Sequence, residues 1–219
     1  MNLCTLILQT VYPSLCRQCF VLVCPTDVFC DPCLATIKPV VTTFFPITKN
    51  TTLKVYAVAN YVQPMRSLIT RKFTGDIRAS GQLADMINVF VPLKNQPIDA
   101  LVPVPLHWTR YASRGYNQAN VIAQRLGKIL HVPVVRAVRR THKTKFQWQL
   151  SADMRRDNVK QAFDVAWWYR HKKLNFLEGK HIVIVDDLCT TGSTLVAVAK
   201  VLAAAKPASL TAVVGCRAV

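Results

Sequence analysis

Apolar and polar positions follow two different periods along residues 51–219. Short apolar runs typical of β-strands occupy residues 55–61, 100–104, 132–138, 182–185 and 210–214. Helices are predicted between them, from helical apolar spacing, an opening proline or a high alanine content, over residues 64–73, 81–90, 117–130 and 194–205. Alternating strands and helices predict an α/β fold with a mainly parallel sheet. The run Ile-Val-Ile-Val at 182–185 is typical of a central strand buried on both faces, so helices are expected on both faces of the sheet.

The first fifty residues have a different composition. Five of the eight cysteines lie within residues 16–33, and residues 38–52 are rich in Pro and Thr, which is typical of a linker. We therefore predict two parts, a small N-terminal module with its linker over residues 1–50 and a larger domain over residues 51–219.

The most informative stretch of the larger domain directly follows the strand predicted at 182–185. Two carboxylates come first, followed by small hydroxylated residues around a glycine: Asp186, Asp187, Thr190, Thr191, Gly192, Ser193 and Thr194. Such a loop can turn backbone N–H groups toward one point at the positive end of the next helix, which makes a phosphate cradle. The carboxylates would repel phosphate, but they can accept hydrogen bonds from vicinal sugar hydroxyls. The pattern predicts a ribose 5-phosphate site. The alternative is an ordinary strand-to-helix turn capped by Thr194.

This stretch resembles the PRPP-binding loop of type I phosphoribosyltransferases, where two acids follow an apolar run and T-x-G-x-T follows two variable residues (PRPP is 5-phosphoribosyl 1-pyrophosphate). A second stretch resembles a signature of the ComF/GntX family of competence-associated phosphoribosyltransferase-like proteins: Val102-Pro103-Val104-Pro105-Leu106-His107, Arg110 and Arg114-Gly115-Tyr116-Asn117-Gln118. Residues 69–73, 139–144, 150–158 and 162–163 are similar to that family too. The resemblance implies a type I phosphoribosyltransferase fold behind a zinc-finger-like N-terminus, with PRPP as ligand.

Basic residues outside the loop are candidates to bind pyrophosphate. Arg110 and Arg114 follow the strand predicted at 100–104, and guanidinium groups can bind phosphate bidentately. Ordinary solvation at the surface is the alternative. In the resemblance, residues 139–145 correspond to the flexible loop that closes over PRPP, so Lys143 or Lys145 would also stabilise departing pyrophosphate. Magnesium is expected to arrive with PRPP, bound mostly through the ligand's own oxygens.

One position departs from the purine-salvage phosphoribosyltransferases. Those enzymes usually carry, where this chain has Thr190, an acid that acts as the base on the purine. Without it we find no general base for a 6-oxopurine and no clear pocket for an acceptor. The departure weakens purine salvage, but it leaves transfer to another base or amine open.

The cysteines of the N-terminal module have the spacing of a metal site. Two CxxC pairs, Cys16 with Cys19 and Cys30 with Cys33, are ten residues apart, which is a common spacing for a tetrahedral zinc site. A segment of this size has too little core to fold unaided, so structural zinc is expected. Cys24 is expected to be a bystander, with exchange into the ligand set as the alternative. Cys4 is a further candidate to extend the cluster, although nothing else in the sequence supports it.

Charge adds a second kind of partner. The chain carries 28 Lys and Arg against 11 Asp and Glu, a net charge of +17, and about half of it lies in residues 136–180. Such a surface favours phosphorylated metabolites, nucleic acid or an anionic membrane surface, although a solvated basic face is the simpler explanation for any single residue. Trp148 and residues 167–169 (Trp-Trp-Tyr) lie among these basic residues. They could stack on bases, or they could simply pack in the core.

Two functions from different classes follow. The family resemblance implies a role in natural transformation, where the protein would handle imported single-stranded DNA, with competence or recombination proteins as partners. The alternative is an active phosphoribosyltransferase that transfers phosphoribose from PRPP to a base or amine. A third possibility makes PRPP a regulatory ligand. The chain has no run of eighteen apolar residues, and no Lys or Arg precedes the short apolar stretch at residues 3–11, so a cytoplasmic protein is expected.

Overall fold

A computed structural model describes six parts of the chain: residues 13–39, 42–48, 51–70, 75–141, 162–169 and 175–218. Several residues singled out from the sequence lie outside these parts: Cys4, Lys143, Lys145, Trp148 and the side chain of Trp168. The predictions made for them therefore stay predictions.

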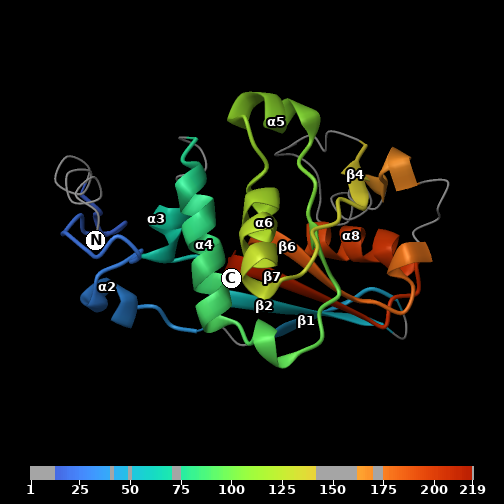
Figure 1. Ribbon diagram of the computed structural model, residues 1–219, viewed down its shortest axis with the longest axis horizontal. Helices are drawn as coiled ribbons and strands as arrows, with labels where there is room; N and C mark the ends of the chain where they lie inside the picture. Colours follow the sequence, from blue (N-terminus) through green and yellow to red (C-terminus); the bar gives the residue numbers. More distant parts are fainter. Residues whose placement is uncertain are drawn as a thin grey trace.

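The main sheet has five strands in the order β1-β2-β7-β6-β3 (Figure 1). The strands are β1 (Thr43–Pro46), β2 (Thr52–Asn60), β3 (Ala100–Pro103), β6 (His181–Cys189) and β7 (Ser209–Arg217). Strands β2, β7, β6 and β3 are parallel to one another, and β1 runs antiparallel to β2. The predicted mainly parallel sheet is confirmed.

Helices cover both faces of this sheet (Figure 1). The helices α3 (Met65–Thr70), α4 (Ile77–Phe90) and α6 (Gln118–Leu130) cover one face, and α8 (Ser193–Ala203) covers the other with a two-stranded ribbon of β4 (Val138–Arg140) and β5 (Phe163–Val165). In β6, Val183 and Val185 belong to the core under α3, α4 and α6, while Ile182 and Ile184 belong to the core under α8 and the ribbon. All four side chains are buried, so the prediction of a central strand buried on both faces is confirmed.

The ends of the larger helices follow from local residues. Asp76 caps α4 by accepting a hydrogen bond from the backbone N–H of Ala79, and Asn117 caps α6 by accepting one from Ala119. The shorter helices are α2 (Asp31–Ala35), α5 (Trp108–Arg114), η2 (Leu93–Asn95), η3 (Trp167–Tyr169) and η4 (Asn175–Leu177).

Two segments differ from the elements predicted. The strand expected at 132–138 is wrong, because only Val134 makes a bridge to β3 there and β4 begins at Val138. Pro133 lacks the N–H that a continuous ladder would need. The other difference is β1, which pairs with β2 within the stretch that we interpreted as a linker. The boundary near residue 50 stays a prediction.

The N-terminal module packs on the larger domain. Cys16, Phe29 and Ile37 are buried in the same core as Val58 of β2 and Met65 of α3. Within the described residues, no helix is both long enough and apolar enough to cross a membrane.

Candidate functional site: the carboxyl edge of β3 and β6

The topology opens a crevice between β3 and β6. After β3 the chain crosses to the face covered by α6, and after β6 it crosses to the face covered by α8. Ligands of parallel sheets bind where neighbouring connections diverge in this way. The two strands stay together as far as the backbone N–H of Val104, which donates to the carbonyl of Val185 over 2.9 Å. Beyond that bond β6 continues to Cys189 beside β7.

The two carboxylates lie on this extension of β6. Asp186 and Asp187 are half-buried, and the backbone N–H of Asp187 donates to Oδ1 of Asp186 over 2.9 Å. The sequence suggested that the strand ends before them, whereas Asp186 still pairs with Val214 of β7. Successive strand residues face opposite sides, so the two side chains begin on opposite faces of the sheet. Their joint hold on the ribose hydroxyls stays a prediction.

The loop after β6 has the backbone that its glycine predicts. Gly192 has φ of 74°, occupies the N-cap of α8 and supplies no side-chain cap. Thr194 lies inside the helix, so the turn is not one that Thr194 caps. The hydroxyls of Thr191 and Ser193 are hydrogen-bonded to each other over 3.0 Å. The first N–H groups of α8, with these hydroxyls, form the surroundings that an anion needs.

Arg217, at the end of β7, is a cation near this loop that sequence reasoning missed. It pairs in register with Cys189, and its Nη1 donates to the hydroxyl of Thr43 in β1 over 2.6 Å. Burial, with the charge of Asp186 second, raises the pKa of the Cys189 thiol to about 11, and Arg217 acts in the opposite direction. The available signal was a charged residue at the end of an apolar strand. Cys189 is buried and protonated, consistent with a packing role.

Three arginines are linked electrostatically, and one of them lies within electrostatic reach of Asp186. Arg110 and Arg114 lie on α5, and Arg140 ends β4. Burial, then the charge of Arg114, lowers the pKa of Arg110, and burial, then the charge of Arg110, lowers the pKa of Arg140. Asp186 opposes the shift at Arg140, which puts that arginine within electrostatic reach of the carboxylate. Cations that disfavour one another's charge gain from a bound anion, which is the chemistry expected of a pyrophosphate site.

The two arginines described within the predicted basic stretch at 139–145 have different surroundings. The guanidinium of Arg140 lies over the ring of Phe163, 5.2 Å from its centroid, and is influenced by the charge of Asp186, whereas Arg139 forms an ion pair of 3.0 Å with Asp164 within the β4–β5 ribbon. His107 directly precedes α5, the helix that carries Arg110 and Arg114. It is buried and caps that helix: its Nδ1 accepts from the backbone N–H of Thr109 over 3.3 Å. His107 has a structural role in this segment.

The four predicted zinc ligands come together. The Sγ atoms of Cys16, Cys19, Cys30 and Cys33 all lie within 4.8 Å of one another. A tetrahedral site with Zn–S bonds of about 2.3 Å needs sulfur atoms about 3.8 Å apart, so the cluster fits a metal ion after a small contraction. Cys24 is exposed and lies outside the cluster.

Backbone amides favour the thiolate form of Cys16. Burial alone would raise the pKa of Cys16, but hydrogen bonds from the backbone of Cys19, Cys30 and Gln18 outweigh it and lower that pKa. Burial, followed by the neighbouring thiols, raises the pKa of Cys33. A metal ion resolves this conflict, because it binds all four sulfurs as thiolates.

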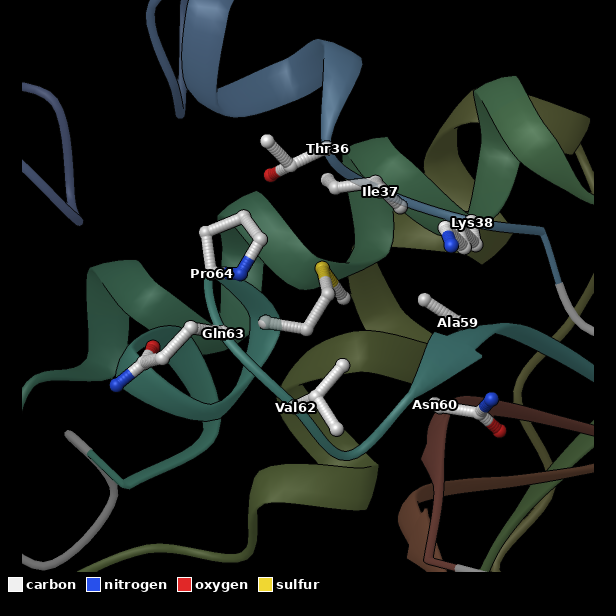
Figure 2. A pocket seen from close by; sticks show the side chains of 9 residues that line it. Thr36, Ile37, Lys38, Ala59, Asn60, Val62, Gln63 and Pro64 are labelled. Atoms are coloured by element: carbon white, nitrogen blue, oxygen red, sulfur yellow. The ribbon is translucent and has the colours of Figure 1, made fainter.

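A cavity of about 210 Å³ lies where the module meets the larger domain (Figure 2). Residues 36–38 line one side, and the end of β2 and the start of α3 line the other. The walls are mainly apolar, and the polar side chains among the lining residues are Thr36, Lys38, Asn60 and Gln63. Since β2 is parallel to β6, the cavity lies at the same carboxyl edge of the sheet as the phosphate loop.

Comparisons with known proteins agree with this fold. The family model of the phosphoribosyl transferase domain matches residues 111–218. Competence protein F of Haemophilus influenzae is 34% identical over 156 residues, which are 68% of this chain and 66% of that protein. DNA utilization protein YhgH of Escherichia coli K12 is 31% identical over 196 residues, which are 86% of this chain and 78% of that protein. Adenine phosphoribosyltransferase of Saccharomyces cerevisiae aligns with a TM-score of 0.39 and 14% identity, over 81% of this chain and 83% of that chain, a likeness too low to add to the assignment.

The sheet, the loop at 186–194 and the domain match define a phosphoribosyltransferase-type domain behind a four-cysteine module. The chain belongs to the ComF/GntX family of competence-associated phosphoribosyltransferase-like proteins. Both the family and the fold expected from the sequence are confirmed.

Proposed function

We propose that this protein acts in natural transformation, in the uptake or handling of single-stranded DNA in the cytoplasm, and that its phosphoribosyltransferase-type domain binds PRPP. The competence role follows from the relatives named for competence and for DNA utilization. The PRPP site is supported by one observation: Asp186, ahead of the loop that leads into α8, lies within electrostatic reach of Arg140 on β4, which is within reach of Arg110 on α5.

Each group has one task in this proposal. The backbone and hydroxyls of the loop hold the 5′-phosphate: Thr190, Thr191, Gly192, Ser193 and Thr194. Asp186 and Asp187 accept hydrogen bonds from the ribose hydroxyls, and Arg110, Arg114 and either Lys143 or Lys145 bind pyrophosphate. Magnesium arrives with PRPP and screens its phosphates, and zinc holds the four-cysteine module together.

Calorimetric titration with PRPP and Mg²⁺ tests the site. Wild-type protein should show saturable binding, and Asp186→Asn/Asp187→Asn should weaken it at least about tenfold, since hydrogen bonds to charged groups contribute about 1.5–3 kcal/mol each. Asp85→Asn is a matched control, because Asp85 is an acid on α4 whose partner is Arg125. If folded, zinc-loaded wild-type protein does not bind PRPP, the loop serves only as scaffold.

Exposed aromatic residues on α5 support the DNA part of the proposal. Trp108 is 73% exposed and Tyr111 is 53% exposed, and their spacing of three residues puts both on one side of the helix. This helix projects from the body of the protein (Figure 1) and carries Arg110 and Arg114. Exposed aromatic rings next to cations are the usual platform for stacking single-stranded bases. Of the aromatics suggested by the sequence, Trp167 is 66% exposed, whereas Tyr169 packs against Phe176 with ring centroids 4.7 Å apart.

Binding of an unstructured oligonucleotide across a salt series tests this surface. Wild-type protein should bind, with an affinity that falls steeply as salt rises. Trp108→Ala should weaken binding by about 1–3 kcal/mol, the usual contribution of one stacked base. Phe44→Ala on the edge strand is the matched control, since Phe44 is 60% exposed. Absence of binding at low salt would rule out direct contact with single strands.

The alternative function is catalytic transfer from PRPP to a nucleobase or amine. It requires an acceptor site, and the cavity of Figure 2 supplies a hollow of suitable size at the same edge of the sheet. Its amides can hydrogen-bond to the edge of a heterocycle. Release of pyrophosphate should then depend on one acceptor from a panel of bases and amines. No release across the panel, by protein that binds PRPP, would leave PRPP as a regulatory ligand.

A further inference from the structure

One side chain leaves the four-cysteine cluster and reaches the larger domain. Arg17 lies between Cys16 and Cys19, and its Nη1 makes an ion pair of 3.0 Å with Oδ2 of Asp76. Its Nε donates to Oε1 of Gln82 over 2.8 Å. The Arg17 and Asp76 side chains are only 16% and 18% exposed. A paired charge in this position is hard to replace, since losing one partner leaves the other poorly solvated.

The metal ligands determine where Arg17 stands. Two of them flank it, and hydrogen bonds hold the turn between them: Cys16 N–H to the Val21 carbonyl over 2.8 Å, and Phe20 N–H to the Cys16 carbonyl over 3.1 Å. The Arg17 N–H donates to the Val28 carbonyl over 3.0 Å, which ties this turn to the segment before Cys30. A metal ion that binds both CxxC pairs therefore fixes the backbone from which the Arg17 side chain starts.

Asp76 joins Arg17 to the segment at residues 108–117, which carries Arg110 and Arg114. The Tyr116 hydroxyl donates to the backbone carbonyl of Asp76 over 3.2 Å, and the tyrosine side chain is buried. In sequence, Tyr116 follows Arg114 and Gly115, where the chain turns with φ of 75°. Asp76 therefore receives Arg17 on its carboxylate and Tyr116 on its carbonyl.

Helix α5 depends on such an anchor. It carries Arg110 and Arg114, whose charges oppose each other, yet none of its seven residues is buried. Because none of its residues is fully buried, core packing contributes little to its position, which is set mainly by the residues at its ends. His107 anchors one end and Tyr116 anchors the other, since both are buried.

We infer that Arg17, Asp76 and Tyr116 are positioning residues through which the four-cysteine metal site holds the pyrophosphate-binding arginines in place. Metal binding then supports PRPP binding without touching PRPP. This inference rests on the proposed PRPP site for its functional consequence, and on the contacts of Arg17, Asp76 and Tyr116 for its structural part.

Arg17→Met tests the inference with the metal in place. Its metal content should equal that of the wild type, and its affinity for PRPP with Mg²⁺ should fall at least about fivefold, the lower end of usual coupling between sites. Asp76→Asn should also weaken PRPP binding, because it removes the charge that pairs with Arg17. The cap of α4 is kept, since asparagine caps a helix as well as aspartate does. Arg125→Met is the control: it breaks the exposed Arg125–Asp85 pair of 2.8 Å, which also involves α4. That variant should bind PRPP normally.

Hydrogen exchange of residues 108–117 provides a readout that needs no PRPP. Exchange should be faster in Arg17→Met, in Tyr116→Phe and in metal-free wild-type protein, and unchanged in Arg125→Met. Unchanged exchange in metal-loaded Arg17→Met, with unchanged PRPP affinity, would overturn the inference. If wild-type protein does not bind PRPP, the proposed site fails, and exchange alone then decides whether the metal site positions this segment.

Discussion

The ring of Phe45 lies against Gly192. A Cβ atom added to the glycine would be 2.5 Å from Cε1 of that ring, closer than side chains tolerate. Phe45 belongs to the edge strand β1 and Gly192 to the phosphate loop, so the segment that follows the N-terminal module forms one wall of the loop. With the bond from Arg217 to Thr43, this contact makes β1 part of the site.

Gly192→Ala should therefore harm the loop in two ways. The left-handed backbone costs an alanine about 1–2 kcal/mol, and the collision with Phe45 adds about 1–3 kcal/mol. Gly179→Ala separates the two effects, because Gly179 also has a positive φ, of 67°, but no atom lies within 4 Å of its added Cβ. Urea unfolding should show a larger loss for Gly192→Ala, and only that variant should lose PRPP affinity. Equal losses would mean that Phe45 simply moves aside.

Arg217→Met should weaken binding of phosphate-bearing ligands. The guanidinium is held beside the loop by Thr43, and a hydrogen bond to a charged group contributes about 1.5–3 kcal/mol. Thr43→Val removes the threonine hydroxyl and keeps the cation, so its effect should be smaller. Titration with PRPP and with ribose 5-phosphate measures both variants. An Arg217→Met protein that binds both ligands normally would limit Arg217 to a structural role.

Metal content should follow the four clustered thiols and no others. Cys19→Ser and Cys33→Ser should lose the bound metal and lower the melting temperature, because the module has little core of its own. Cys24→Ser should retain both, since Cys24 is exposed and outside the cluster. Elemental analysis of purified protein identifies the ion and its stoichiometry. Retention of metal in Cys33→Ser, with loss in Cys24→Ser, would mean that Cys24 is a ligand instead.

Acid should weaken the sheet near the start of β3. Asp99 accepts a hydrogen bond from the backbone N–H of His181 over 2.8 Å, and this bond, with Lys180 nearby, holds the pKa of Asp99 below its ordinary value of 3.8. A carboxyl whose pKa is lower in the folded state stabilises the fold above its unfolded pKa and loses that effect as pH falls through the folded pKa.

The difference in unfolding midpoint between wild type and Asp99→Asn should therefore be present at pH 7 and should shrink as the pH falls below about 4. Urea unfolding at both pH values measures it. A difference that does not change with pH would mean that the hydrogen bond, and not the charge, matters.

The sequence predicted the parts whose signal is local. The Ile-Val run of β6 and the glycine of the phosphate loop have the predicted structure, because a strand buried on both faces must be apolar throughout and a left-handed turn favours glycine. The four cysteines also cluster as predicted.

The missed features depend on contacts distant in sequence. Strand β1 has four residues, one of them proline, and exists because it pairs with β2. Helix α5 buries no residue, so it shows no apolar period that would predict it. The pairs Arg17–Asp76 and Arg217–Thr43 join residues 59 and 174 positions apart, and no local pattern marks either partner.

Strands β3 and β6 end at different points along the sheet, and this difference determines the size of the crevice between them. The last residue of β3 pairs with Val185, while β6 continues for four more residues to Cys189. Those four residues lie beside β7 on one side and border the crevice on the other. Lengthening β3 by two residues would pair Asp186 and Asp187 with backbone and narrow the crevice. The length of β3 therefore determines how much of β6 is open to a ligand.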